Sequence, residues 1–142
     1  MVGHDRQPAP SIPRHLELRL HATRRAVSEA RRVLRALRLP APLDDDAELA
    51  LSELVTNSVR HAGLGPHDPI RISLDWLGTR LRVHVRDGAG PDPATVSGSI
   101  RPPAGAESGW GLYLVDRLAG RWGTTADGCW FELRYQQPPP GC

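Results

Sequence analysis

The chain has 142 residues, enough for one domain that buries a hydrophobic core without help from disulfides or metals. Hydrophobic residues make up 39% and charged residues 24%, as in globular proteins, and the net charge of +2 gives no reason to expect nucleic acid or a membrane as a partner. All 18 residues in the Lys and Arg class are arginines. The absence of lysine excludes a standard P-loop, the common protein-kinase fold and Schiff-base chemistry.

Both ends of the chain are rich in proline and are predicted to be disordered arms, residues 1–13 and 136–142, around one domain at residues 14–135. Residues 1–13 lack the apolar segment of a secretion signal, and no apolar run is long enough to cross a membrane, so we expect a cytoplasmic protein. Cys129 and Cys142 are too few for a disulfide framework or a zinc site.

The first half of the domain is predicted to contain a strand and two helices. Residues 15–20 alternate apolar and polar side chains, which is typical of a half-buried strand. Residues 24–39 have apolar side chains at helical spacing and arginines between them, and Pro40 would stop that helix. The acidic run 44–46 predicts the N-terminus of a second helix that reaches about His61.

The second half is predicted to contain two hairpins, a helix and a long loop. The hairpin strands are 70–76 with 81–85 and 122–126 with 129–135, the helix is 112–118, and the loop, interpreted as a lid, is 88–108. This order of elements predicts an α/β (α+β) two-layer sandwich with a mixed sheet and the helices on one face.

One face of the second helix carries side chains suited to a metal–phosphate site. Glu53, Asn57 and then Arg60 or His61 follow one another at helical spacing. An amide oxygen can bind Mg²⁺, a carboxylate can accept a proton, and basic groups can face phosphate oxygens. On spacing alone, an ordinary solvent-facing helix is the simpler interpretation.

Two glycine clusters add to this helix. Residues 87–90, Asp-Gly-Ala-Gly, follow a predicted strand directly, where an Asp can accept a hydrogen bond while the glycines let a ligand approach the backbone. Residues 109–112, Gly-Trp-Gly-Leu, open the third helix and would present free N–H groups to an anion. An adenine contact, a lid and a phosphate cradle together predict a nucleotide pocket.

These segments resemble the motifs of the GHKL superfamily of gyrase, heat-shock chaperone, histidine-kinase and MutL ATPases. Residues 53–62 look like its N-box, residues 87–90 its first glycine box and residues 109–112 its second. Residues 111–123 and 130–133 are similar to small bacterial regulators, the anti-sigma-factor serine kinases. The resemblance covers roughly residues 15–135 and implies a Bergerat-type fold that binds ATP and Mg²⁺.

The resemblance also implies roles for single residues and for partners. Glu53 would be the general base, Asn57 the Mg²⁺ ligand, Arg60 and His61 neighbours of the phosphates, Asp87 the acceptor of the adenine amino group with Gly88 and Gly90 beside the base, and Gly109, Trp110, Gly111 and Leu112 the phosphate-side segment at the end of the lid. The expected partners are a sigma factor, a STAS-type antagonist protein that receives the phosphoryl group on a serine, or both. Family members of this type often form homodimers.

The sequence departs from the family pattern at three places. The first glycine box is one residue shorter than usual, Glu107 stands where kinase members often have an arginine, and Gly128 replaces a common threonine. Arg101 in the lid is expected to offset the charge of Glu107 and to contact the nucleotide. These departures keep open an alternative, a binding-only partner module with a degenerate nucleotide site and no kinase activity.

Overall fold

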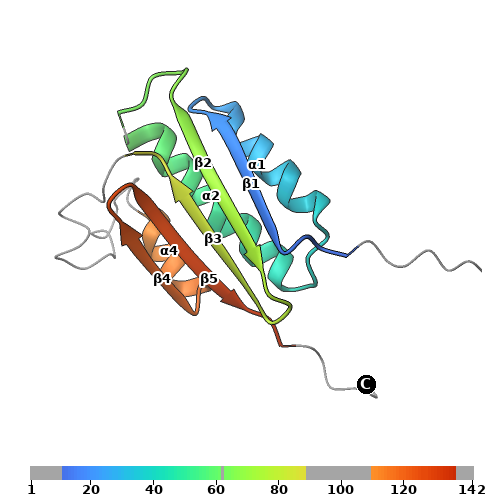
Figure 1. The fold of residues 1–142 in the computed structure, drawn as a ribbon. Coiled ribbons are helices and arrows are strands. Elements are labelled where there is room, and N and C mark those ends of the chain that lie inside the picture. The colour runs from blue at the N-terminus through green and yellow to red at the C-terminus, as the bar shows by residue number, and fades with distance from the viewer. Residues whose placement is uncertain (1–10, 62, 89–109, 137–142) are drawn as a thin grey trace, which may run out of the picture.

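The computed structural model, shown in Figure 1, describes residues 11–61, 63–88 and 110–136. Its elements are β1 (His15–His21), α1 (Arg25–Ala36), α2 (Leu43–His61), β2 (Pro69–Trp76), β3 (Arg80–Arg86), α4 (Trp110–Leu118), β4 (Arg121–Thr125) and β5 (Gly128–Arg134). Every predicted strand and helix is present. The predicted arms lie outside the described residues apart from 11–13 and 136, and the predicted lid does so apart from Gly88.

Helix α1 ends earlier than the sequence predicted. The helix, whose buried stripe consists of Ala26, Ala30 and Leu34, ends at Ala36, three residues before the predicted end at Leu39. Arg38 adopts a left-handed backbone conformation with φ of 53°. A left-handed residue cannot continue a right-handed helix, and Pro40 disfavours helical geometry at Leu39, so the chain turns here toward α2.

The five strands form one sheet in the order β1-β2-β3-β5-β4, and all four neighbouring pairs are antiparallel. The predicted fold class is confirmed, but the prediction of a sheet that mixes parallel and antiparallel pairs is wrong for these strands. Strands β3 and β4 do run in the same direction, since both are antiparallel to β5. Because β5 lies between them, the crossover through α4 produces no parallel pair.

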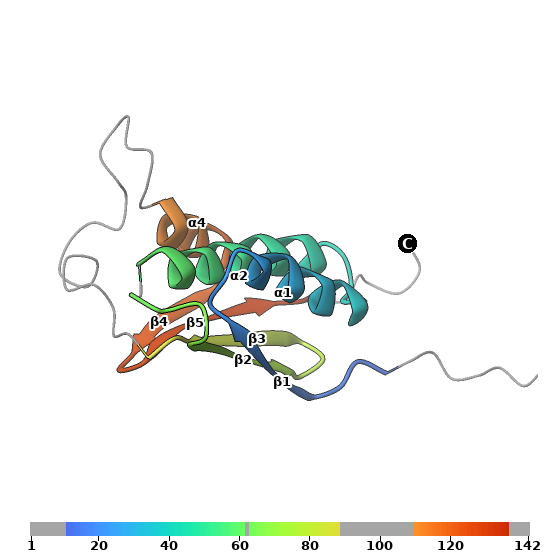
Figure 2. The same ribbon diagram turned by 90° about the horizontal axis from the view of Figure 1, so that it is seen from above.

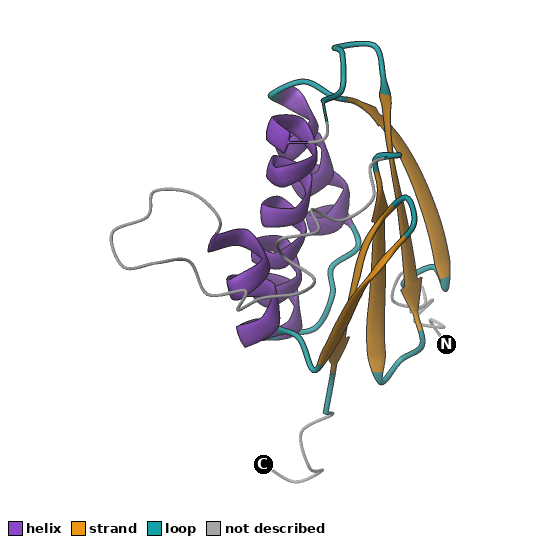
Figure 3. Ribbon diagram, turned by 90° about the vertical axis from the view of Figure 1, so that its left-hand side faces the viewer, coloured by secondary structure: helices purple, strands orange, loops and turns teal. Residues whose placement is uncertain are grey.

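All three described helices lie on one face of the sheet, so the domain has two layers, as Figures 2 and 3 show. The strands supply one apolar side chain at every second position toward the helices, among them Ile72, Val83 and Phe131, each at most 1% exposed. Helix α2 lies between α1 and α4 and packs against both. The core therefore fixes α2 over the sheet, with α4 beside it.

The other face of the sheet has no helix over it among the described residues (Figure 3). Strand β3 shows the contrast, because Leu81, Val83 and Val85 are buried while Arg80, Arg82 and Arg86 on alternate positions are exposed. We call this charged surface the open face.

Candidate functional site

The C-terminal half of α2 carries the predicted metal–phosphate residues. Glu53 and Asn57 are half-buried and lie one helical turn apart, while Arg60 is exposed near the end of the helix. The neighbouring stripe of the same helix is buried under the sheet through Leu54, Val55 and Ser58. Glu53 and Asn57 thus lie at the border between core and solvent, where a ligand can reach both. His61 is the last residue of α2.

Asp87 lies where β3 ends, and it is joined to α2. The Ser58 hydroxyl donates a hydrogen bond of 2.7 Å to Asp87 Oδ2. On the other side, the backbone amides of Asp87 and Gly88 both donate to the Asp127 carbonyl at 3.0 Å. Two separate elements, α2 and the turn before β5, therefore hold this acidic residue. Gly88 has φ of +79°, a left-handed conformation that glycine adopts without strain.

Ser58 was not among the predicted site residues. It follows Asn57 and is 4% exposed, so its hydroxyl is a polar group inside an otherwise apolar stripe. Buried polar groups need hydrogen-bond partners. A serine at an apolar position of the helix was therefore the signal in the sequence that could have identified Ser58. Its partner, Asp87, is 29 residues away and could be identified only from the fold.

Helix α4, which packs against α2, begins with residues 110–112 of the second glycine box. It begins at Trp110, its residue Val115 is fully buried, and Leu112 is half-buried. The Trp122 indole N–H donates 2.7 Å to Asp116 Oδ1, which ties the exposed side of α4 to β4. The first N–H groups of a helix have no intrahelical acceptor, so Trp110, Gly111 and Leu112 present donors at this end. Gly90, Arg101 and Gly109 lie outside the described residues.

Comparison with known families gives a match over residues 16–128 to the histidine kinase-like ATPase domain. This match covers most of the chain. The protein belongs to the histidine kinase-like ATPase domain family. A comparison with curated proteins gave no match. Membership supports ATP binding in a regulatory protein, and the sequence resemblance to the GHKL superfamily is confirmed at that level.

In this ATPase domain, the first residues of β5 lie beside the end of β3 that carries Asp87. A Cβ atom at Gly128 would lie 2.0 Å from the Val85 carbonyl oxygen, so no side chain fits at the position where the resemblance led us to expect a threonine. The next residue, Cys129, pairs with Val85 and is on the helix side of the sheet. Burial raises the pKa of the Cys129 thiol to about 11, with a smaller contribution from the Asp87 carboxylate in the same direction. The Cys129 side chain near Asp87 is therefore a neutral thiol.

The donors present fit the Mg²⁺ that accompanies ATP in this family. Among the described residues, no three His, Cys, Asp or Glu side chains are grouped closely enough to hold a metal ion by themselves. Asn57 and Glu53 offer hard oxygen donors on α2, and Mg²⁺ usually takes one or two protein ligands together with phosphate oxygens and waters. A nucleotide-dependent metal site of this kind would need Asn57 and the phosphates of the bound ATP.

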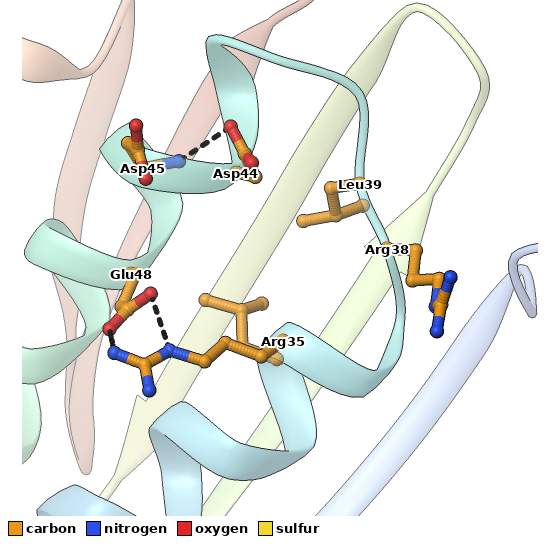
Figure 4. A pocket seen from close by; sticks show the side chains of 7 residues that line it. Arg35, Arg38, Leu39, Asp44, Asp45 and Glu48 are labelled. Carbon is orange, nitrogen blue, oxygen red and sulfur yellow. Dashed lines mark hydrogen bonds and ion pairs between the residues drawn. The ribbon is translucent and has the colours of Figure 1, made fainter.

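A separate hollow of about 260 Å³ lies at the other end of α2 (Figure 4). Its lining comes from the end of α1, the following turn and the first turns of α2. Arg35 of α1 donates through Nε to Glu48 Oε2 at 3.0 Å and through Nη2 to Glu48 Oε1, while Arg38 points away from this pair. The hydrogen bond from Arg35 lowers the pKa of Glu48. The hollow is lined by none of the predicted nucleotide residues, and the ion pair joins the two helices.

None of the helices in residues 11–61, 63–88 and 110–136 is both long and apolar enough to cross a membrane.

Proposed function

We propose that the protein is an ATP- and Mg²⁺-dependent regulatory kinase of the anti-sigma-factor type, which transfers a phosphoryl group to a serine or threonine of a partner protein. The observation that carries the proposal is the contact between Ser58 and Asp87. It joins the helix with the metal–phosphate residues to the strand end with the first glycine box. The family match over residues 16–128 supports the ATP-binding part of the proposal.

Asp87 would recognise the adenine. An ionised carboxylate accepts several hydrogen bonds, so Asp87 can take one from the adenine amino group in addition to the one from Ser58. The hydrogen bond from Ser58 and the backbone bonds to Asp127 fix the direction of the carboxylate before ATP arrives. A pre-organised acceptor loses less freedom on binding, which favours affinity. Gly88 and Gly90 would leave room for the base.

Asn57 would bind Mg²⁺. The bound ion would neutralise part of the negative charge of the phosphates. Arg60, His61 and the N–H groups that open α4 would face the phosphate oxygens. Glu53 would accept the proton of the partner's hydroxyl group. A bond then forms between that oxygen and the γ-phosphorus, and the bond from the γ-phosphorus to the bridging oxygen breaks to leave ADP.

The proposed partners are a STAS-type antagonist that accepts the phosphoryl group and a sigma factor that competes with it. The sequence resemblance of residues 111–123 and 130–133 to anti-sigma-factor kinases supports both. Such partners imply a cytoplasmic protein, and homodimer formation belongs to the same proposal.

The first experiment measures ATP binding by calorimetry with and without Mg²⁺. We expect Asp87→Asn and Ser58→Ala to weaken binding by about tenfold or more, because hydrogen bonds to a charged group contribute about 1.5–3 kcal/mol. Asn57→Ala should remove the Mg²⁺ dependence. Asp45→Asn, an exposed position on the first turn of the same helix, is the matched control and should bind ATP as the native protein does. Equal binding by all variants would contradict the assignment.

The second experiment tests transfer. The protein is incubated with γ-labelled ATP and a STAS-type antagonist protein, and Glu53→Gln should bind ATP but label the antagonist at least about a hundredfold more slowly. If ATP binds and no candidate antagonist is labelled, the kinase proposal fails and the binding-only alternative is the better description.

A further inference from the structure

The strand register divides the outward side chains of the open face into rows that run across the sheet. One row contains His15, Asp75, Arg82, Glu132 and Arg121, each directly opposite the next. Another contains Arg19 of β1, Arg71 of β2 and Arg86 of β3, again directly opposite one another. We call these the alternating row and the arginine row.

The alternating row places opposite charges at facing positions. Positive and negative side chains take turns along it, and His15 Nδ1 lies 2.6 Å from Asp75 Oδ1. Glu132 is 4% exposed between its two arginine neighbours, and its Oε1 accepts no hydrogen bond within the described residues but lies 3.7 Å from Nη1 of Arg80, a residue outside this row. Opposite charges on facing strands stabilise a sheet, so folding alone explains this row.

The arginine row has no such explanation. Like charges directly opposite each other on neighbouring strands destabilise a sheet. Within the described part of the chain, no carboxylate lies at ion-pair distance from Arg19 or Arg71, and Arg86 has only Asp127, with 3.9 Å between Nε and Oδ2. All three arginines are exposed. The nearest carboxylate along β1, Glu17, lies 3.3 Å from His15 Nε2 instead.

We propose that the arginine row is a docking surface for the acidic face of a helix on a partner protein. Residues opposite each other in an antiparallel sheet have Cα atoms about 4.5–5.5 Å apart. Carboxylates three or four residues apart on a helix have Cβ atoms about 5–6 Å apart, so one helix lying across the strands can meet Arg19, Arg71 and Arg86 in succession. Binding of carboxylates would remove the repulsion within the row. The inference does not rest on the proposed kinase activity, because the row is on the face opposite to α2.

Two other occupants fit less well. Single-stranded nucleic acid binds sheet faces by stacking bases on aromatic rings. The Arg82 guanidinium, 4.3 Å from the ring centroid, already covers the indole of Trp130 in the neighbouring row. A second copy of this chain would bring an equally basic row against the first, which like-charge repulsion opposes.

The test uses the full-length protein and a fluorescent alanine-based helical peptide with glutamates three and four residues apart along one face. Binding is followed by fluorescence anisotropy at low ionic strength, where such pairs are least screened. We expect the double variant R19Q/R71Q to bind the peptide at least about tenfold more weakly. The matched control R121Q removes one arginine from the alternating row and should change affinity by less than about threefold.

Two further readouts separate docking from a structural role. The urea midpoint of R19Q/R71Q should equal or exceed that of the native protein, because two like charges have been removed from facing positions. A peptide with glutamine in place of glutamate should not bind. The proposal is overturned if R121Q loses as much affinity as R19Q/R71Q, if the native protein does not bind the acidic peptide, or if it binds a single-stranded oligonucleotide more tightly than the peptide.

Discussion

The two faces of the sheet come from the same strands and obey different rules. On the helix side, neighbouring strands place one apolar residue beside another, as with Ile72 opposite Val85, and burial of apolar area stabilises every such pair. On the open face, the same register places Arg71 opposite Arg86 and also Asp75 opposite Arg82. Few apolar side chains face each other there, so the charges of facing residues decide which pairs stabilise the sheet and which destabilise it.

The largest difference between the faces should appear in adjacent residues of β5. Phe131 is fully buried among the core residues, whereas Trp130 is half-buried on the open face between Arg82 and Arg121. We expect Phe131→Ala to lower the free energy of unfolding by about 3–5 kcal/mol through lost burial and a cavity. Trp130→Ala should cost about 1–2 kcal/mol, from partial burial and a cation–π contact. Urea denaturation measures both, and similar losses would show that the open face is covered more fully than the described residues indicate.

Replacing glycines on β4 and β5 with alanine should give smaller losses of stability, which differ according to what each new Cβ atom would touch. A Cβ at Gly128 would lie 2.0 Å from the Val85 backbone oxygen, and one at Gly123 would lie 2.9 Å from Trp130 Nε1. The backbone of β3 cannot move away without separating strands, whereas an indole on the open face can turn. We expect Gly128→Ala to cost about 3 kcal/mol and Gly123→Ala about 1 kcal/mol by urea denaturation.

The control for this pair is Gly120→Ala, whose Cβ would have its nearest neighbour at 3.9 Å. Its effect should stay within about 0.5 kcal/mol. If Gly128→Ala were as mild as this control, the close approach of β5 to β3 would be relieved elsewhere, and a threonine at this position would be tolerated after all.

The sequence was sufficient to predict the helices and strands because the patterns that mark them are local. Alternation in residues 15–20 and 81–85 identifies which side chains face the helices, and the acidic run 44–46 marks where α2 begins. The end of α1 was missed because the left-handed turn at Arg38 is made by a residue that seldom adopts it. The purely antiparallel sheet was missed because strand order depends on where β5 inserts, which no local pattern records.

The candidate site was predictable only in part, for a related reason. Motif spacing singled out Asn57 and Asp87 as candidates, but the Ser58 hydroxyl that holds Asp87 depends on a contact across the fold. The arginine row on the open face also depends on contacts between strands that are far apart in the sequence. Arg19, Arg71 and Arg86 look like ordinary outward positions on three strands, and only the register makes them neighbours.

The smallest expected effect separates two histidines on the open face. Hydrogen bonds to Asp75 and then to Glu17 raise the pKa of His15, whereas burial, followed by the charge of Arg86, lowers the pKa of His84. Titration followed by NMR should therefore place His15 above and His84 below the ordinary value of 6.5. Asp75→Asn should bring the pKa of His15 back toward 6.5 and leave that of His84 where it was, and a shift of both histidines in the same direction would contradict this account.

The two shifts act on stability in opposite senses. The folded protein holds a proton at His15 more tightly than the unfolded chain does, so this contribution is complete below pH 6.5 and is lost as the pH rises through the raised pKa. The folded protein holds a proton at His84 less tightly, so its contribution is present above pH 6.5 and is lost as the pH falls through the lowered pKa. The His15 loss lies above pH 6.5 and the His84 loss lies below it, so these two groups should make the native protein most stable near pH 6.5 in urea denaturation, with a decline on either side. In Asp75→Asn the decline above pH 6.5 should become smaller, because the hydrogen bond from Asp75 is the largest cause of the His15 shift, while the decline below pH 6.5 should remain.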